Sequence, residues 1–141
     1  MADVVLDSNI LLRYLTDEPP ELAERAARLL EVAEGRRLRV IVAPLTLAEV
    51  VFVLESVYAW KRRQIADRML ALVSASVFEF LERDVIAQTL VWYRDVGAVH
   101  FADAYVAALA ANRSGMLASF DRAVKRLPGV RVADTAENLP S

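Results

Sequence analysis

The sequence has no cysteine, a single histidine and only four glycines among its 141 residues. Without cysteine the chain can form no disulfide, and the common zinc-finger ligand patterns are excluded. The glycines, at positions 35, 97, 115 and 129, are isolated from one another, so no glycine-rich loop is present to hold nucleotide phosphates. The lone histidine, His100, cannot build a paired acid–base site.

Long apolar runs and a strong charge are also missing. No stretch of about 18 apolar residues occurs, so we expect no membrane span. The first residues include neither a basic region nor a long apolar region, and we expect no signal peptide. Together with the absence of cysteine, this favours a cytoplasmic protein. At a net charge of −2, contact with nucleic acid would depend on local basic patches.

The chain is rich instead in apolar segments that alternate between strand and helix patterns. This alternation predicts an α/β fold in which helices cover both faces of a parallel sheet. No linker or repeat interrupts the pattern, so a single domain over residues 1–141 is predicted. The expected strands are 4–6, 39–43, 77–81, 116–119 and 130–133. The expected helices are 10–15, 20–34, 47–58, 61–74, 84–97 and 102–113, with a short one at 121–127.

Four acidic residues stand beside these apolar segments. Asp7 and Asp121 each follow a predicted strand, where open α/β sheets place their ligands. Glu49 and Asp103 each begin an apolar helical stretch. If the fold brings the four together, they form a carboxylate site for a hard divalent cation. Without a cation, four converging carboxylates would repel one another strongly.

Each acid also has an ordinary structural explanation. The segment Thr46 to Glu49 fits a capping box, in which the glutamate satisfies a backbone N–H. Asp103 suits the first turn of a helix, where the macrodipole favours negative charge. Asp7 and Asp121 suit N-cap positions. For any one acid this explanation is the more common one, and it is their combination that favours a metal site.

Four short motifs, in this order, resemble those of PIN-domain ribonucleases: residues 6–11, 47–50, 101–104 and 119–122. The chain length is most similar to that of VapC-type toxins of bacterial toxin–antitoxin systems. The resemblance implies a five-stranded parallel sheet in the order 3-2-1-4-5 and an endoribonuclease that depends on Mg²⁺ or Mn²⁺. It also implies a homodimer and a small antitoxin partner, in a heterotetramer or larger assembly.

The expected chemistry is hydrolysis of RNA by a metal-activated water. We expect Asp7 and Asp103 to bind the metal directly and Asp121 to bind it directly or through water. Glu49 would orient a water or act as an outer ligand. Asn9 is close enough in sequence to hydrogen-bond an acid or the phosphate, although turn and cap chemistry explains it equally well.

Ser119 has the same two explanations as Asn9. The basic cluster of Arg122, Lys125 and Arg126 is the best candidate for RNA contact because it begins beside Asp121. This cluster and His100 stand where many PIN domains carry additional acids, which leaves the number of bound metals open.

Two other functions compete with the nuclease. The first is a non-catalytic PIN-like binding module for protein or RNA, whose site has decayed. The second is a small-molecule phosphatase, which is disfavoured because residues 7–9 read Asp-Ser-Asn and lack a second aspartate. The segment from Val50 to Trp60 is apolar on more than one face. It is either a fully buried helix or an interface for a second copy or an antitoxin.

Overall fold

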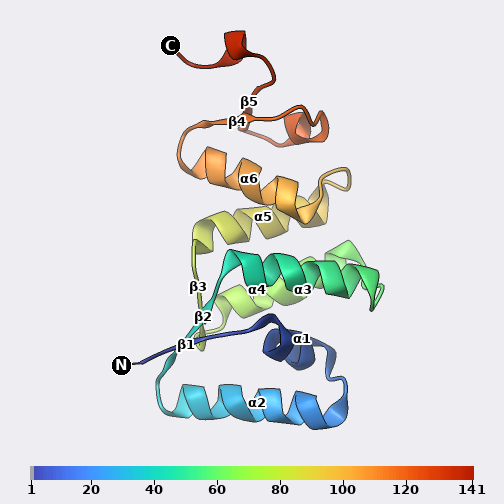
Figure 1. Ribbon diagram of the computed structural model, residues 1–141, viewed down its shortest axis with the longest axis vertical. Helices are drawn as coiled ribbons and strands as arrows, with labels where there is room; N and C mark the ends of the chain where they lie inside the picture. Colours follow the sequence, from blue (N-terminus) through green and yellow to red (C-terminus); the bar gives the residue numbers. More distant parts are fainter. Residues whose placement is uncertain (1) are drawn as a thin grey trace. The chain divides into compact units, whose positions relative to one another are not determined.

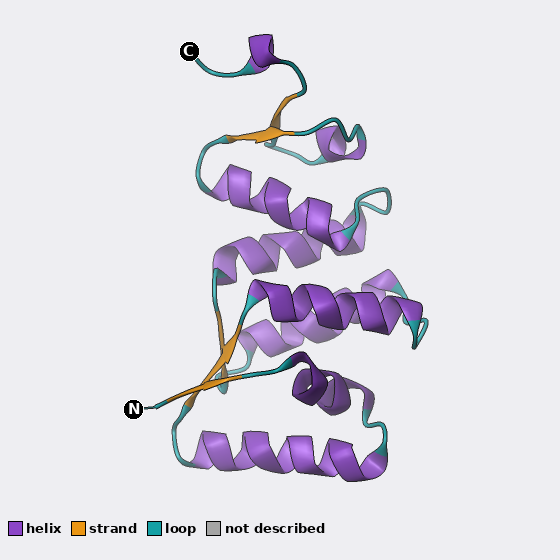
Figure 2. Ribbon diagram, in the orientation of Figure 1, coloured by secondary structure: helices purple, strands orange, loops and turns teal. Residues whose placement is uncertain are grey.

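The computed structural model describes residues 2–141, and the chain divides into two compact units. Unit 1 extends to Arg83, and unit 2 extends from Asp84 to Ser141. Figures 1 and 2 show short strands joined by helices in both. Over residues 2–141 the fold is α/β with parallel strands and six α-helices, as the sequence predicted.

The sheet of unit 1 has three parallel strands in the order β1-β2-β3. Val4 pairs with Val40, and Val40 in turn pairs with Phe78. The central strand is buried, as expected for a parallel strand covered by helices. The strands are β1 (Asp3–Val5), β2 (Arg39–Val42) and β3 (Phe78–Phe80).

Four helices surround this sheet, and their apolar faces form the core of unit 1. On the third of them, Leu47, Val50, Val51 and Leu54 are buried at the three- and four-residue spacing of one helix face. Fully burying a side chain of this size stabilises the fold by about 1.5–3 kcal/mol. The helices are α1 (Ser8–Thr16), α2 (Pro20–Gly35), α3 (Pro44–Ser56) and α4 (Arg62–Ser74).

Unit 2 contains two helices, a two-stranded parallel sheet and two 3-10 turns. Its core includes Trp92, Val99, Ala104 and Leu127. Small residues on its second helix, such as Ala104, allow close packing. The elements are α5 (Arg83–Asp95), which begins at the last residue of unit 1, α6 (Phe101–Asn112), β4 (Met116–Ala118), η1 (Ala123–Arg126), β5 (Arg131–Ala133) and η2 (Ala136–Asn138).

The prediction of one five-stranded sheet is wrong for this structure, since the strands of residues 2–141 form a three-stranded and a two-stranded sheet. The β1-β2-β3 and β4-β5 neighbours agree with the order 3-2-1-4-5, but no ladder joins the two sets. Apart from the four-residue β2, the strands have only three residues each. Their sequences specify burial and direction but contain little that selects a neighbour.

Helix α3 and the expected helix at 121–127 also differ from what the sequence predicted. Helix α3 begins at Pro44, three residues before the expected start, because proline is favoured at the first helical position. The expected helix at 121–127 is instead the shorter 3-10 turn η1, and the tail contains the 3-10 turn η2. No helix within residues 2–141 is long and apolar enough to cross a bilayer.

Candidate active site

Asp7 lies where strand β1 leads into helix α1. Leu6 donates its backbone N–H to the Ile41 carbonyl at 2.9 Å, which keeps the chain in line with β2 up to this point. Asp7 is then the N-cap of α1, and its carboxylate accepts a long hydrogen bond of 3.4 Å from the Asn9 N–H. The capping explanation is therefore confirmed. The contact occupies one oxygen, so the exposed carboxylate still has an oxygen available for another ligand.

Glu49 lies in the second turn of α3, where it has no capping role. Because the helix begins at Pro44, its N-cap is Ala43, and Thr46 is already the third helical residue. The capping box expected between Thr46 and Glu49 is therefore wrong. The Glu49 side chain is exposed and forms no hydrogen bond or ion pair within residues 2–141.

Glu49 shares one exposed face of α3 with two large apolar side chains. Leu45 is four residues before it and Phe52 three residues after it, so the three lie in one row. Leu45 is 80% exposed and Phe52 68% exposed. An acid between two exposed apolar side chains is well placed to be covered by a partner or substrate.

Asp103 lies in the first turn of α6, as expected from the sequence. The N-cap of this helix is His100, which makes no side-chain capping bond. The Asp103 side chain is half-buried and forms no hydrogen bond or ion pair in the described part of the chain.

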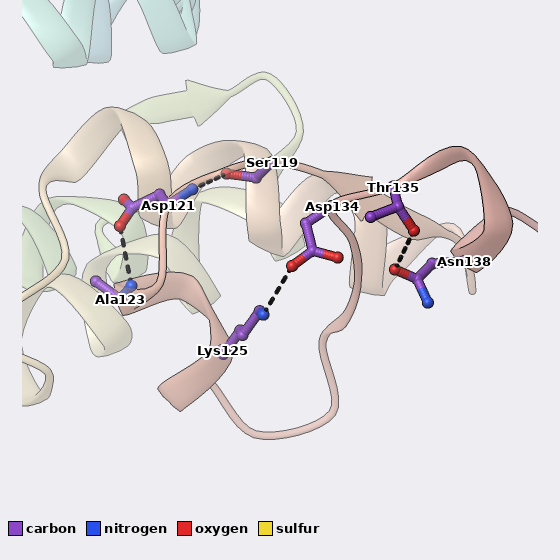
Figure 3. Close-up of polar contacts among 7 residues, drawn as sticks. All are labelled: Ser119, Asp121, Ala123, Lys125, Asp134, Thr135 and Asn138. Atoms are coloured by element: carbon purple, nitrogen blue, oxygen red, sulfur yellow. Dashed lines mark hydrogen bonds and ion pairs between the residues drawn. The ribbon is translucent and has the colours of Figure 1, made fainter.

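Asp121 is held more firmly than the other acids, in the turn that follows β4 (Figure 3). Its carboxylate accepts a hydrogen bond from the Ala123 N–H at 2.9 Å. Its own N–H donates to the Ser119 hydroxyl at 3.0 Å, and the Ser119 N–H donates to the Ala133 carbonyl at 3.0 Å. The N-cap expected at Asp121 is wrong, because the N-cap of η1 is Arg122. The turn explanation for Ser119 is confirmed, and the bond from the Ala123 N–H fixes the direction of the Asp121 carboxylate.

The other predicted site residues lie beside these acids. Asn9 is exposed in the first turn of α1, two residues after Asp7. Arg122 is exposed directly after Asp121 and forms no ion pair within residues 2–141. Lys125 is different, because its ammonium pairs with the Asp134 carboxylate at 3.1 Å (Figure 3). The basic cluster therefore retains two unpaired arginines, Arg122 and Arg126.

The Asp134 side chain was not recognised from the sequence. The hydrogen bond from Lys125 and the positive charge of that side chain lower the pKa of the Asp134 carboxyl. Nine residues separate the two partners, and no sequence pattern of fixed spacing indicates such a contact across a loop. Asp134 is thus an additional acid near Asp121, but its charge is balanced by Lys125.

The structure groups the acids by unit. Asp7 and Glu49 belong to unit 1, and Asp103 and Asp121 belong to unit 2. Over residues 2–141, no acid of this set forms an ion pair with a basic side chain, which leaves their charge uncompensated within each unit. Within neither unit do three or more described His, Asp or Glu side chains gather into a group that could hold a metal ion.

The PIN-domain family model matches residues 4–130, which includes most of both units. The chain therefore belongs to the PIN-domain family, whose members are typically nucleases and commonly use Mg²⁺. The match includes Asp7, Glu49, Asp103 and Asp121. A search of curated proteins found no significant match to the chain.

Proposed function

We propose that this PIN domain is a metal-dependent endoribonuclease that acts as the toxin of a toxin–antitoxin pair. The observation that carries the proposal is the state of the four acids. Asp7 and Asp121 each follow a parallel strand and accept one backbone hydrogen bond, and Glu49 and Asp103 make no polar contact of their own. Carboxylates without ion pairs at strand ends and near helix starts have oxygen atoms available to bind a hard cation.

The donor set fits a hard divalent ion. Carboxylate oxygens are the ligands that Mg²⁺ and Mn²⁺ prefer, whereas zinc sites use the cysteine and histidine that this chain almost lacks. We propose Asp7 and Asp103 as direct ligands, with Asp121 as a direct or water-mediated ligand. When bound, the ion supplies an activated water and neutralises charge on the scissile phosphate.

The protein side chains then position the reactants. Ser119 holds the backbone of Asp121, so this carboxylate does not need to reorganise during the reaction. Glu49 has both oxygens available to accept a hydrogen bond from the attacking water. Arg122 is next to Asp121 and presents a planar guanidinium that suits a phosphate group.

The second candidate is a non-catalytic PIN-like binding module. Arg122 and Lys125 follow Asp121 where many PIN domains have another acid, and within neither unit do three described acids cluster. Such a protein would still bind RNA or protein but would not cut RNA. Only an assay of RNA cleavage distinguishes this binding module from the nuclease.

The partner assignment is also a proposal, supported by the exposed apolar face of α3. Phe52 is 68% exposed and Val57 is 71% exposed, so the alternative of a fully buried helix is wrong for these two residues. We propose that this face is covered by a second copy of the chain and by an apolar, helical antitoxin segment. Because Glu49 lies in the same row as Phe52, a segment bound here would also cover Glu49.

Cleavage of a mixture of structured and single-stranded RNAs tests the proposal. We expect cleavage with Mg²⁺ or Mn²⁺ and none in EDTA, and restoration when excess metal is added. Asp103→Asn serves as the control against a contaminating nuclease. Full activity in EDTA would overturn the metal mechanism, and RNA binding without cleavage would favour the non-catalytic module.

A further inference from the structure

A small cavity in unit 2 is lined in part by Ser119 and Phe120, the two residues that precede Asp121 in the sequence. It has a volume of about 290 Å³, at the lower end of the roughly 300–1,000 Å³ usual for small-molecule sites. Its floor includes Ala118 and Ala133, which are paired across β4 and β5, and their small side chains leave the space open. Its walls include Phe120 and Leu139.

Phe120 is the most exposed large apolar side chain among the described residues, at 92%. Leu139, on the other side, is 53% exposed. Fully burying a side chain of this size is worth about 1.5–3 kcal/mol, and the isolated chain does not gain this at Phe120. An aromatic ring left uncovered next to a cavity and an acid of the candidate active site indicates a ligand with a flat face.

The rim of the cavity is polar. Ser119 accepts a hydrogen bond from the Asp121 N–H, and its hydroxyl hydrogen is still available to donate. The Thr135 hydroxyl donates to the Asn138 side-chain oxygen at 2.9 Å, and its own oxygen can still accept (Figure 3). Donors and acceptors around an apolar floor suit the edge of a heterocyclic base.

Arg122 does not line the cavity but lies two residues after Phe120 in the sequence, and its positive charge suits a phosphate-bearing ligand. Lys125 balances the charge of Asp134 at the rim, while Arg122 is exposed and forms no ion pair in the described part of the chain. A guanidinium next to an aromatic wall is the combination that binds the backbone and base of single-stranded nucleic acid.

We propose that this cavity binds one unpaired nucleotide of the RNA substrate, with its base stacked on Phe120 and its phosphate near Arg122. The inference rests on the proposed function, since it assigns a substrate subsite to the same nuclease. It predicts a preference for single-stranded RNA, because a base paired within a duplex cannot enter the cavity.

A second cavity of the same volume, about 290 Å³, lies in unit 1 with Asp7 at its edge. Its lining is aliphatic, with Val5, Ile10 and Leu29 among the contributors and no aromatic side chain. It offers no ring on which a base could stack. Of these two cavities, only the one lined by Phe120 offers a ring for stacking.

The test is the affinity for a labelled, unstructured RNA oligonucleotide, measured by fluorescence anisotropy in EDTA so that no RNA is cut. Stacking is worth about 1–3 kcal/mol per base, so Phe120→Ala should weaken binding roughly 5- to 150-fold. Phe120→Trp should retain the affinity, because every base can stack on an indole. Leu22→Ala, which truncates an exposed leucine on α2, is the matched control and should bind like the wild type.

Oligonucleotides with a single abasic position complete the test. For the nucleotide that occupies the cavity, the abasic substitution combined with Phe120→Ala should weaken RNA binding no more than either change alone. Fully additive losses at every position, or unchanged affinity of Phe120→Ala, would overturn the subsite.

If the wild type still cuts RNA in that case, the proposed nuclease function stands; a wild type that neither binds nor cuts RNA overturns both. Loss of self-association in Phe120→Ala at unchanged RNA affinity would assign the cavity to a protein contact instead and overturn the subsite.

Discussion

Unit 1 and unit 2 present their acids in the same way but hold them differently. Each has one acid after a parallel strand, Asp7 or Asp121, and one acid near the start of a helix, Glu49 or Asp103. Asp121 is half-buried and held by bonds of 2.9 and 3.0 Å, whereas Asp7 is exposed and accepts one long bond of 3.4 Å.

This difference distinguishes two roles that a carboxylate at a strand end can have. Asp121 is fixed by its turn before any ligand arrives, so it suits a group that positions the reaction. Asp7 is exposed and its one accepted bond is long, so its carboxylate can turn towards a cation and suits a direct metal ligand. The four predictions below test this comparison, from the largest expected effect to the smallest.

Removing one charge from either unit should abolish cleavage. Substitution of outer-shell partners of a metal typically costs about 10–100-fold. Asp7→Asn or Asp103→Asn, which replaces a proposed direct ligand, should therefore reduce the cleavage rate by more than about 100-fold. Without metal, the melting temperature should be unchanged or slightly higher, because the proposed site would lose one of its mutually repelling carboxylates. Cleavage rates and melting temperatures should be measured for each variant in EDTA and in Mg²⁺. If only one of the two variants loses activity, the acids of the two units do not act together.

Glu49→Gln separates a site residue from a structural one. A glutamine would serve a helix cap as well as glutamate, but α3 is capped at Ala43, so stability should not change. If Glu49 is an outer ligand or orients the attacking water, its replacement should lower the cleavage rate about 10–100-fold. Steady-state kinetics and thermal unfolding should be measured on the same preparation. Turnover equal to that of the wild type would remove Glu49 from the site.

Phe52→Glu tests whether the exposed face of α3 is an interface. A charge at a central apolar contact typically costs 2 kcal/mol or more, so the dissociation constant of the dimer should rise by at least about 30-fold. Size-exclusion chromatography with light scattering at micromolar protein measures it. Trp60 is a poorer probe, because the Arg68 guanidinium lies 5.6 Å from its ring centre.

Leu22→Glu, on the exposed side of α2, is the control for this experiment. It introduces the same charge on another helix of unit 1 and should leave the assembly intact. A wild type that is a monodisperse monomer and binds no antitoxin would assign Phe52 to ordinary surface.

Lys125→Met should have the smallest effect. Without the ammonium, the pKa of the Asp134 carboxyl should rise towards its ordinary value, which NMR titration detects directly. A carboxyl with a lowered pKa in the folded state stabilises the fold above its unfolded pKa, and this contribution is lost as the pH falls through the folded pKa. Any difference in melting temperature between the variant and the wild type should therefore be present at neutral pH and disappear in acid. An unchanged pKa of Asp134 would contradict the ion pair.

Much of the fold followed from local patterns in the sequence. All five strands and six α-helices lie close to their expected positions, because apolar periodicity and proline position determine each segment locally. The pairing of strands was not predictable in the same way. A three-residue strand such as β1 or β4 has too few side chains to specify its neighbour, and the expected single sheet was wrong.

The candidate site shows the same limit at the level of single residues. The acids could be found because each stands at the end of a strand or near the start of a helix. The role of Glu49 was misjudged in one respect, because the sequence suggested a helix start at Leu47 while Pro44 begins the helix one turn earlier. The Lys125–Asp134 pair and the cavity beside Phe120 depend on how loops fold back, which no local pattern encodes.

Direct measurement of metal binding tests the central claim most closely. Calorimetric titration of Mn²⁺ into the wild type, Asp7→Asn and Asp103→Asn does not depend on knowing the RNA substrate. If Asp7 and Asp103 bind one metal, each substitution should remove the same binding event, and saturating Mn²⁺ should raise the melting temperature of the wild type only. Equal Mn²⁺ affinity in all three proteins would contradict the account.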